Sequence, residues 1–120
     1  MTESEMKQRT QSFALRVLKL AEALPRSRSG NMIAAQIVRS GTSVAANYRA
    51  RCRSKSRADF INKTAIVEEE ADETSLWLEM IVEAGLLKRE QVAPLAQEAD
   101  ELTAILVASR KTASRRRAAH

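Results

Sequence analysis

The sequence is poor in the residues that interrupt helices and in those that build catalytic or metal sites. Its 120 residues include only three glycines, two prolines, one cysteine and one histidine. Ala, Leu, Glu, Arg and Lys are abundant, which is a helix-forming composition. One cysteine cannot form an intramolecular disulfide, and a histidine at position 120 cannot anchor a metal centre in a core. We therefore expect a single all-α domain that holds no cofactor and no metal.

Signatures of catalysis are also missing. No Glu-x-x-His motif occurs, so the sequence lacks the ligands of the di-iron centre found in some four-helix bundles. A glycine-rich phosphate loop and a Ser/His/Asp set are absent as well. Cys52 lies among arginines, which would lower the pKa of its thiol, but no internal base is available to complete a nucleophilic pair. The sequence therefore predicts a protein that is not an enzyme.

Long apolar runs are absent too. The longest run, residues 104–108, is far shorter than the ~20 residues that span a bilayer. The first dozen residues alternate in charge and lack the apolar core of a signal peptide. We expect a cytoplasmic protein with no membrane-spanning segment.

What the sequence does contain is helical periodicity in four segments. We expect helices over about residues 3–24, 31–53, 56–85 and 88–111. Asn31 is the expected N-cap of the second helix, and Ser56 with Asp59 matches a capping box at the start of the third. Pro94 leaves two alternatives for the fourth helix, a firm start near Ala93 or a kink. Such helices pack most simply as an antiparallel up-down-up-down four-helix bundle over residues 1–111, followed by a basic, disordered tail over residues 112–120.

Each helix has an apolar stripe that should face the core. The residues expected inside include Phe13, Leu20, Ile37, Val44, Phe60, Val67, Leu78, Leu102 and Leu106. Leu15 and Leu18 are expected to widen the first stripe. Gly41 lies on the second stripe and thins that helix, so a neighbouring backbone can come close.

A second stripe lies on the third helix, beside its core seam. It consists of Ile66, Glu70, Glu73 and Trp77, and it suits either the edge of the core or an oligomer interface. If the second and third helices form a hairpin about Lys55, residues whose numbers sum to roughly 110 lie level. Arg39 then lies beside Glu70 and Glu73, and the three form a candidate structural ion pair.

Positive charge is concentrated in two clusters. The first consists of Arg49, Arg51, Arg53, Lys55 and Arg57, with no acid among them, and the second includes Arg115, Arg116 and Arg117 near the C-terminal end. Phosphate contacts require only positive charge, so these residues predict a rim that binds RNA or DNA backbone. The chain has only four aromatic residues, so few side chains can stack on bases, and we expect binding to be weakly sequence-selective.

Two alternatives to nucleic-acid binding stay open. The first basic cluster also suits the C-terminus of a helix, where cations meet the negative end of the helix dipole. The chain could equally be a protein-interaction adaptor or scaffold whose partner the sequence does not name.

Several segments resemble a known family. They are QIVR at residues 36–39, SVAANYR at 43–49, SRADF at 56–60, IVEEEADET at 66–74 and WLE at 77–79. In these segments the chain resembles the four-helix-bundle proteins encoded in intervening sequences of bacterial 23S rRNA genes. The resemblance implies an up-down bundle, assembly into homopentamers and no established biochemical activity. Many relatives have Ala-Glu-Gly after the asparagine, where this chain has Arg49-Ala50-Arg51.

A more distant similarity concerns the fold alone. It is to the accessory variability proteins of diversity-generating retroelements, which are pentameric bundles that bind nucleic acid and a reverse transcriptase.

Overall fold

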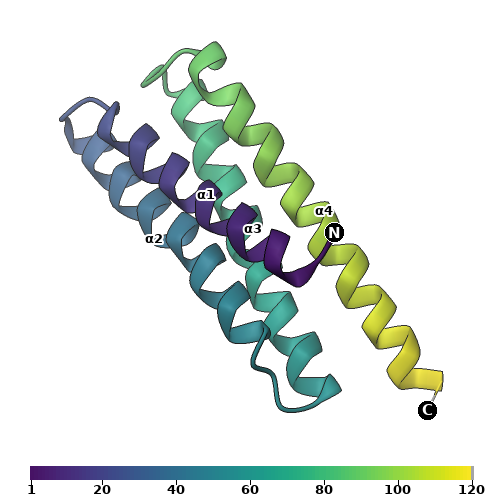
Figure 1. Cartoon of the computed structure of the whole chain (residues 1–120). Helices are drawn as coiled ribbons and strands as arrows, with labels where there is room; N and C mark the ends of the chain where they lie inside the picture. Colours follow the sequence, from purple (N-terminus) through teal and green to yellow (C-terminus); the bar gives the residue numbers. More distant parts are fainter. Residues whose placement is uncertain (120) are drawn as a thin grey trace.

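The chain folds into four long helices in the computed structural model (Figure 1). The structure describes residues 1–119, without the side chains of Arg117 and Ala119. Its helices are α1 (Glu3–Glu22), α2 (Arg28–Arg51), α3 (Arg57–Glu83) and α4 (Arg89–Ala119). The expected all-α fold is confirmed. None of these helices has an apolar stretch long enough to cross a membrane.

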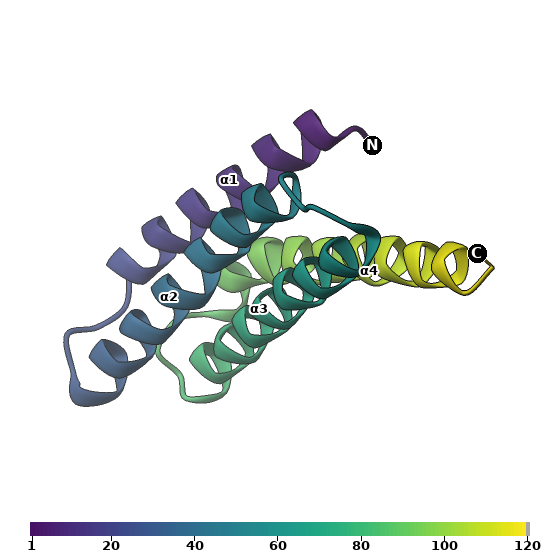
Figure 2. The same ribbon diagram turned by 90° about the horizontal axis from the view of Figure 1, so that it is seen from below.

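Consecutive helices run antiparallel and pack side by side, which confirms the up-down-up-down bundle. In Figure 2, α1, α2 and α3 run nearly parallel in projection, whereas α4 diverges from α1 toward its C-terminal end. Contact between α1 and α4 is sparse compared with the contacts between consecutive helices (α1/α2, α2/α3 and α3/α4), so the bundle is open along that side. The molecule measures 52 × 23 × 20 Å, and its long axis follows the helices.

The starts of α2 and α3 depend on serine caps. The Ser56 hydroxyl accepts a hydrogen bond from the Asp59 amide at 3.0 Å, as expected, whereas the Asp59 carboxylate reaches one residue further back, to the Lys55 amide. For α2 the expected cap was wrong. Ser27 is the N-cap and accepts from the Gly30 amide, so Asn31 lies inside the first turn.

Gly85 ends α3 as the sequence predicts. Its φ of +70° lies in the left-handed region, which favours glycine. The Leu86 amide donates to the Ile81 carbonyl and the Gly85 amide donates to the Val82 carbonyl, each at 3.0 Å. These are the two hydrogen bonds of a Schellman motif, and the partly buried Leu86 packs against the core beyond it.

Helix α4 differs from expectation at both ends. It begins at Arg89, more than a turn before Pro94, so a start near Ala93 is wrong. The Gln91 side chain accepts from the Lys88 amide at 2.9 Å and thereby caps this first turn. At the other end the helix continues to Ala119 instead of ending near Lys111. Ala113 is 7% exposed, so the packing that holds α4 extends past the expected boundary.

The core contains most of the residues expected there, although Leu20 and Phe60 are only partly buried. Leu15 and Leu18 were expected to widen the apolar stripe of α1, but they are 58% and 38% exposed. The buried face of α1 instead continues through Met6 and Thr10, which lie in helical register with Phe13.

Gly41 marks the closest approach of α2 to α1. A Cβ at this position would lie 2.7 to 2.9 Å from three carbons of Val17, which is fully buried and stiff at χ1. The absence of a side chain therefore sets the distance between the two helices.

We predict that Gly41→Ala destabilises the protein by about 1–3 kcal/mol, because the added methyl overpacks the core. At an ordinary helical site the same change stabilises by about 1 kcal/mol. Urea unfolding followed by circular dichroism measures the difference. In a Val17→Ala background the methyl has room, and Gly41→Ala should become stabilising. A wild-type protein made more stable by Gly41→Ala would contradict the close packing.

A charged pair joins α1 to α4 along the open side of the bundle. Arg9 Nε and Nη2 donate to the two carboxylate oxygens of Glu98 at 2.8 and 2.7 Å, in a bidentate arrangement. Glu98 is 16% exposed, and the hydrogen-bonded Arg9 holds its pKa below the ordinary value of 4.5. Glu101 extends the pair at 3.7 Å from Arg9.

Because the folded-state pKa of Glu98 is lowered, its contribution to stability is present above pH 4.5 and disappears as the pH falls through the lowered value. We predict that Glu98→Gln costs about 1–2 kcal/mol at pH 7. That difference from wild type should shrink as the pH falls below 4.5 and through the lowered pKa of Glu98. Urea unfolding at pH 7 and at a series of pH values below 4.5 tests this, and a difference that does not change with pH would show that the pair contributes nothing through charge.

Candidate functional site

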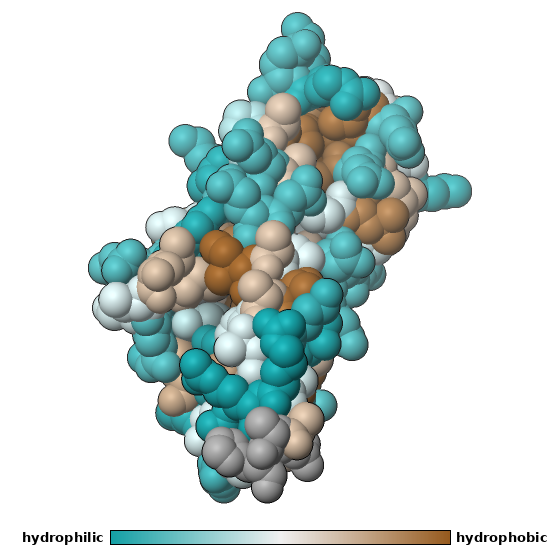
Figure 3. All heavy atoms as spheres, turned by 90° about the vertical axis from the view of Figure 1, so that its right-hand side faces the viewer, coloured by the Kyte–Doolittle hydropathy of each residue, from teal (hydrophilic) through white to brown (hydrophobic). Residues whose placement is uncertain are grey.

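The antiparallel topology brings the two basic clusters to one end of the bundle. Helices α2 and α4 both end where α3 begins (Figures 1 and 2). We call this region the basic end; its exposed members are Arg49, Arg53, Lys55, Arg57, Arg115 and Arg116. Figure 3 shows strongly hydrophilic residues over the lower part of the molecule, where α4 ends, and hydrophilic residues over much of the upper part as well. The side chain of Arg117, also expected in this cluster, lies outside the described residues.

Two acids of α3 near the basic end are already engaged, whereas Glu3 at the start of α1 is in no ion pair among the described residues. Asp59 pairs with Lys63 at 3.1 Å, and its pKa is lowered by the hydrogen bond from the Lys55 amide and by Lys63. Glu68 pairs with Arg110 at 2.7 Å. Within the described part of the chain, no acid lies within ion-pair distance of the six exposed members of the basic end. Their positive charge is therefore available to an external anion.

Arg51 departs from the expected rim. It is only 9% exposed and its side chain turns into the bundle. Its Nε donates to the Thr64 hydroxyl on α3 and its Nη2 donates to the Ser109 hydroxyl on α4, both at 2.8 Å. The guanidinium carbon lies 4.2 Å from the centre of the Phe60 ring and 4.9 Å from that of Tyr48. Arg51 therefore joins three helices and is removed from the candidate phosphate contacts.

The environment of Arg51 makes its burial tolerable. Two hydroxyl acceptors, two aromatic rings and the negative end of the α2 dipole stabilise the cation. The buried Tyr48 phenol has a raised pKa, because burial outweighs the opposing effect of Arg51. A signal for this role was present in the sequence, since residues 37, 41, 44, 48 and 51 share one helical stripe.

The expected ion pair on the α2/α3 surface lies together in the structure. Arg39 Nη1 lies 3.3 Å from a Glu70 oxygen, and Nη2 contacts Glu73. The Trp77 indole N–H donates to the same Glu73 carboxylate at 3.1 Å. Ile66 is half-buried on the same helix. The stripe thus forms one polar-lined surface at the edge of the core, and its proposed use as an interface stays a prediction.

Cys52 does not have the lowered pKa that its arginine neighbours suggested. Burial raises the pKa of the thiol above its ordinary value, and the nearby Glu3 carboxylate raises it further. The expectation was wrong because local sequence does not reveal that the residue is partly covered. No three His, Cys, Asp or Glu side chains among the described residues are grouped so that they could hold a metal ion.

Comparison with known proteins extends over nearly the whole bundle. The sequence profile of the 23S rRNA-intervening sequence protein family matches residues 2–108. The chain belongs to this family. A crystal structure of a protein of unknown function, from the S23 ribosomal protein family of Bacteroides thetaiotaomicron, is 36% identical and superposes with a TM-score of 0.82. The match covers 88% of this chain and 98% of that chain.

A search of curated proteins found no match. The more distant similarity to retroelement accessory proteins has no support in these comparisons. The family assignment agrees with the resemblance seen in the sequence, and the family match ends before Arg115 and Arg116. Part of the basic end therefore lies beyond the segment that this chain shares with the family profile.

We predict that Arg51→Ala lowers the free energy of unfolding by about 2–4 kcal/mol, because it removes buried packing and leaves two hydroxyls without their donor. The neighbouring exposed changes Arg49→Ala and Arg53→Ala should stay within about 0.5 kcal/mol of wild type. Urea unfolding of the three variants measures this. Equal, small effects at all three positions would place Arg51 in the solvated rim.

Proposed function

We propose that this protein is a non-enzymatic helical-bundle protein that binds nucleic-acid backbone through its basic end. The observation that supports the proposal most is the convergence of two sequence-distant basic clusters, whose exposed members have no acid within ion-pair distance among the described residues. A duplex presents one phosphate charge per ~1.7 Å of its axis, so it can engage several separated cations at once.

Such contacts carry little sequence information. Backbone phosphates position a protein on a duplex, whereas base edges in the grooves specify sequence. The exposed members of the basic end are all arginines or lysines at helix ends and in a turn, which suits contact with backbone phosphates more than reading of base edges. We therefore expect similar affinity for duplexes of unrelated sequence.

The test is fluorescence anisotropy with a short labelled RNA or DNA duplex at several salt concentrations. The triple variant Arg49→Ala, Arg53→Ala, Arg57→Ala should weaken binding and flatten the log-log salt slope by up to about 0.9 for each phosphate that is no longer neutralised. The double variant Arg115→Ala, Arg116→Ala should act in the same direction, because both clusters contact one ligand.

A matched control removes three exposed cations from the opposite end of the bundle, by Arg26→Ala, Arg28→Ala and Arg89→Ala. This control should leave the salt slope nearly unchanged. An equal effect from both triple variants would show that binding depends on the total charge of the protein and not on the basic end. Failure of the wild-type protein to bind any duplex at low salt would overturn the proposal and favour the protein-adaptor alternative.

We also propose that the protein self-associates through the outer face of α3. Leu76 and Met80 are 48% and 36% exposed beside Trp77, so apolar surface continues outward from the Ile66–Trp77 stripe. Large exposed apolar side chains on one face are typical of protein interfaces. The family resemblance suggests a homopentamer, which remains an expectation.

Light scattering at micromolar concentration tests this association. Trp77→Asp together with Leu76→Asp should shift the protein toward the monomer, because each change buries a charge at the interface. Leu15→Asp, at an exposed leucine of α1, serves as the control and should leave the assembly intact. A monomeric wild type would exclude the interface, and dissociation by the control alone would move it to α1.

A further inference from the structure

A pocket of about 600 Å³ opens at the basic end, between the first turn of α3 and the last turns of α4. Arg57 and Phe60 line it from α3, and Ser109, Thr112 and Arg116 line it from α4. Its volume falls in the range of small-molecule sites, which is roughly 300–1,000 Å³. Charged, hydroxyl and aromatic groups thus meet in one cavity.

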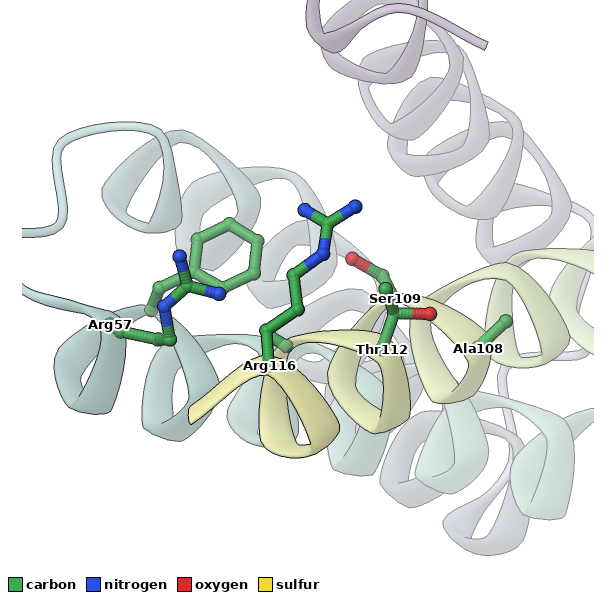
Figure 4. Close-up of a pocket in the computed structure, with 7 residues that line it drawn as sticks. Arg57, Ala108, Ser109, Thr112 and Arg116 are labelled. Carbon is green, nitrogen blue, oxygen red and sulfur yellow. The ribbon is translucent and has the colours of Figure 1, made fainter. Parts of the chain in front are cut away.

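Two guanidinium groups share this pocket. Figure 4 shows the side chains of Arg57 and Arg116 extending over it from the two helices, with the hydroxyls of Ser109 and Thr112 beyond Arg116. Neither arginine has an acid within ion-pair distance among the described residues. Like charges directed at one space repel, and an anion between them removes that repulsion. Arginine suits phosphate in particular, because its planar fork can donate two parallel hydrogen bonds.

The hydroxyl groups of the pocket have hydrogen-bonding capacity left. Elsewhere in the described helices, several threonine hydroxyls donate to the carbonyl four residues earlier, namely those of Thr10, Thr42, Thr64, Thr74 and Thr103. Thr112 makes no such bond within the described residues. Ser109 accepts from Arg51 at 2.8 Å, which leaves its own proton to donate. Both hydroxyls can therefore bind a polar ligand.

Phe60 supplies an apolar surface to the same cavity. Its ring also lines the neighbouring pocket, which contains Arg51, and the Arg51 guanidinium stacks on it at 4.2 Å from the ring centre. The half-buried Phe60 thus lines both the pocket and the neighbouring cavity that holds Arg51. An aromatic ring fixed by a cation beneath it offers a planar surface on which a second flat group can stack.

We propose that this pocket holds one unpaired nucleotide at the end of a nucleic-acid strand. Its phosphate lies between Arg57 and Arg116, its base stacks on Phe60, and Ser109 and Thr112 donate to its polar atoms. A simple anion would leave the aromatic surface unused, whereas a nucleotide uses the charged, polar and apolar parts together. The proposal rests on the proposed function, because the duplex behind the unpaired nucleotide is held by the rest of the basic end.

The experiment compares a blunt duplex with the same duplex carrying a single unpaired 2-aminopurine nucleotide at one end. Stacking quenches 2-aminopurine fluorescence, so the probe reports the base and anisotropy reports the duplex. Wild type should quench the probe and bind the overhang duplex roughly five- to one-hundred-fold more tightly than the blunt one. Phe60→Tyr should keep both properties, and Phe60→Leu should lose both while binding the blunt duplex as before.

A second pair of variants avoids the core. Ala108 is exposed and lines the pocket, so Ala108→Leu should fill it, and Ala104→Leu places the same side chain one turn earlier on α4, outside the pocket. Only Ala108→Leu should abolish the quenching. Free adenosine monophosphate should reverse the quenching, and inorganic phosphate at the same concentration should not.

The outcomes separate the two proposals. A wild type that binds the blunt duplex but neither quenches the probe nor prefers the overhang overturns the nucleotide pocket alone. Quenching that survives both Phe60→Leu and Ala108→Leu, or that inorganic phosphate reverses equally well, also overturns it. Absence of binding to either duplex overturns the proposed function, and the pocket with it.

Discussion

The arrangement of the basic end depends on one buried cation. Arg51 closes α2 and donates to Thr64 on α3 and to Ser109 on α4, so a single guanidinium fixes the relative positions of three helices. No carboxylate lies within ion-pair distance of it in the described part of the chain; hydroxyls, aromatic rings and the end of the α2 dipole stabilise it instead. A positive charge held this way adds to the field of the exposed arginines rather than cancelling it.

Helix packing in the rest of the bundle allows the basic end to extend beyond α1. Helix α2 approaches α1 closely at Gly41, and the α3 seam packs continuously on both neighbours. Helices α1 and α4, by contrast, meet over little of their length and are joined by the charged pair Arg9–Glu98. The last turns of α4 can therefore extend beyond α1 and place Arg115 and Arg116 near the start of α3. The family match stops at residue 108, so this extension lies outside the segment matched to the family profile.

The regular features of the fold could be predicted from the sequence. The four-three spacing along α3 identified its buried face, Gly85 its end and Ser56 its start, because each depends on local geometry. Pairing residues at the same level of the α2–α3 hairpin also placed Arg39 beside Glu70 and Glu73. Arg51 could not be told from Arg49 and Arg53 by composition, since only packing against α3 and α4 distinguishes them. The helical spacing of Arg51 from Tyr48 and Val44 does place it on the buried face of α2. The seven-residue spacing from Leu106 to Ala113 likewise indicated that α4 continues past Lys111.

The pocket between α3 and α4 could not be predicted from the sequence, for a different reason. It requires that residues 57 and 116 face the same space, and nothing in either segment alone specifies the other. Counting aromatic residues also misled, because Phe60 has a core-like position in the α3 seam yet lines an open cavity. Whether an aromatic residue is buried in the core or open to a ligand is decided by tertiary packing, and residue type alone does not reveal it.

The central claim is that two clusters far apart in the sequence act as one surface. Photocrosslinking tests it most directly, with a photoreactive amino acid placed at position 53 in one protein and at position 115 in another. We expect both positions to crosslink to the same short segment of a single bound duplex. Crosslinks from only one position, or from the two positions to unrelated segments, would contradict it.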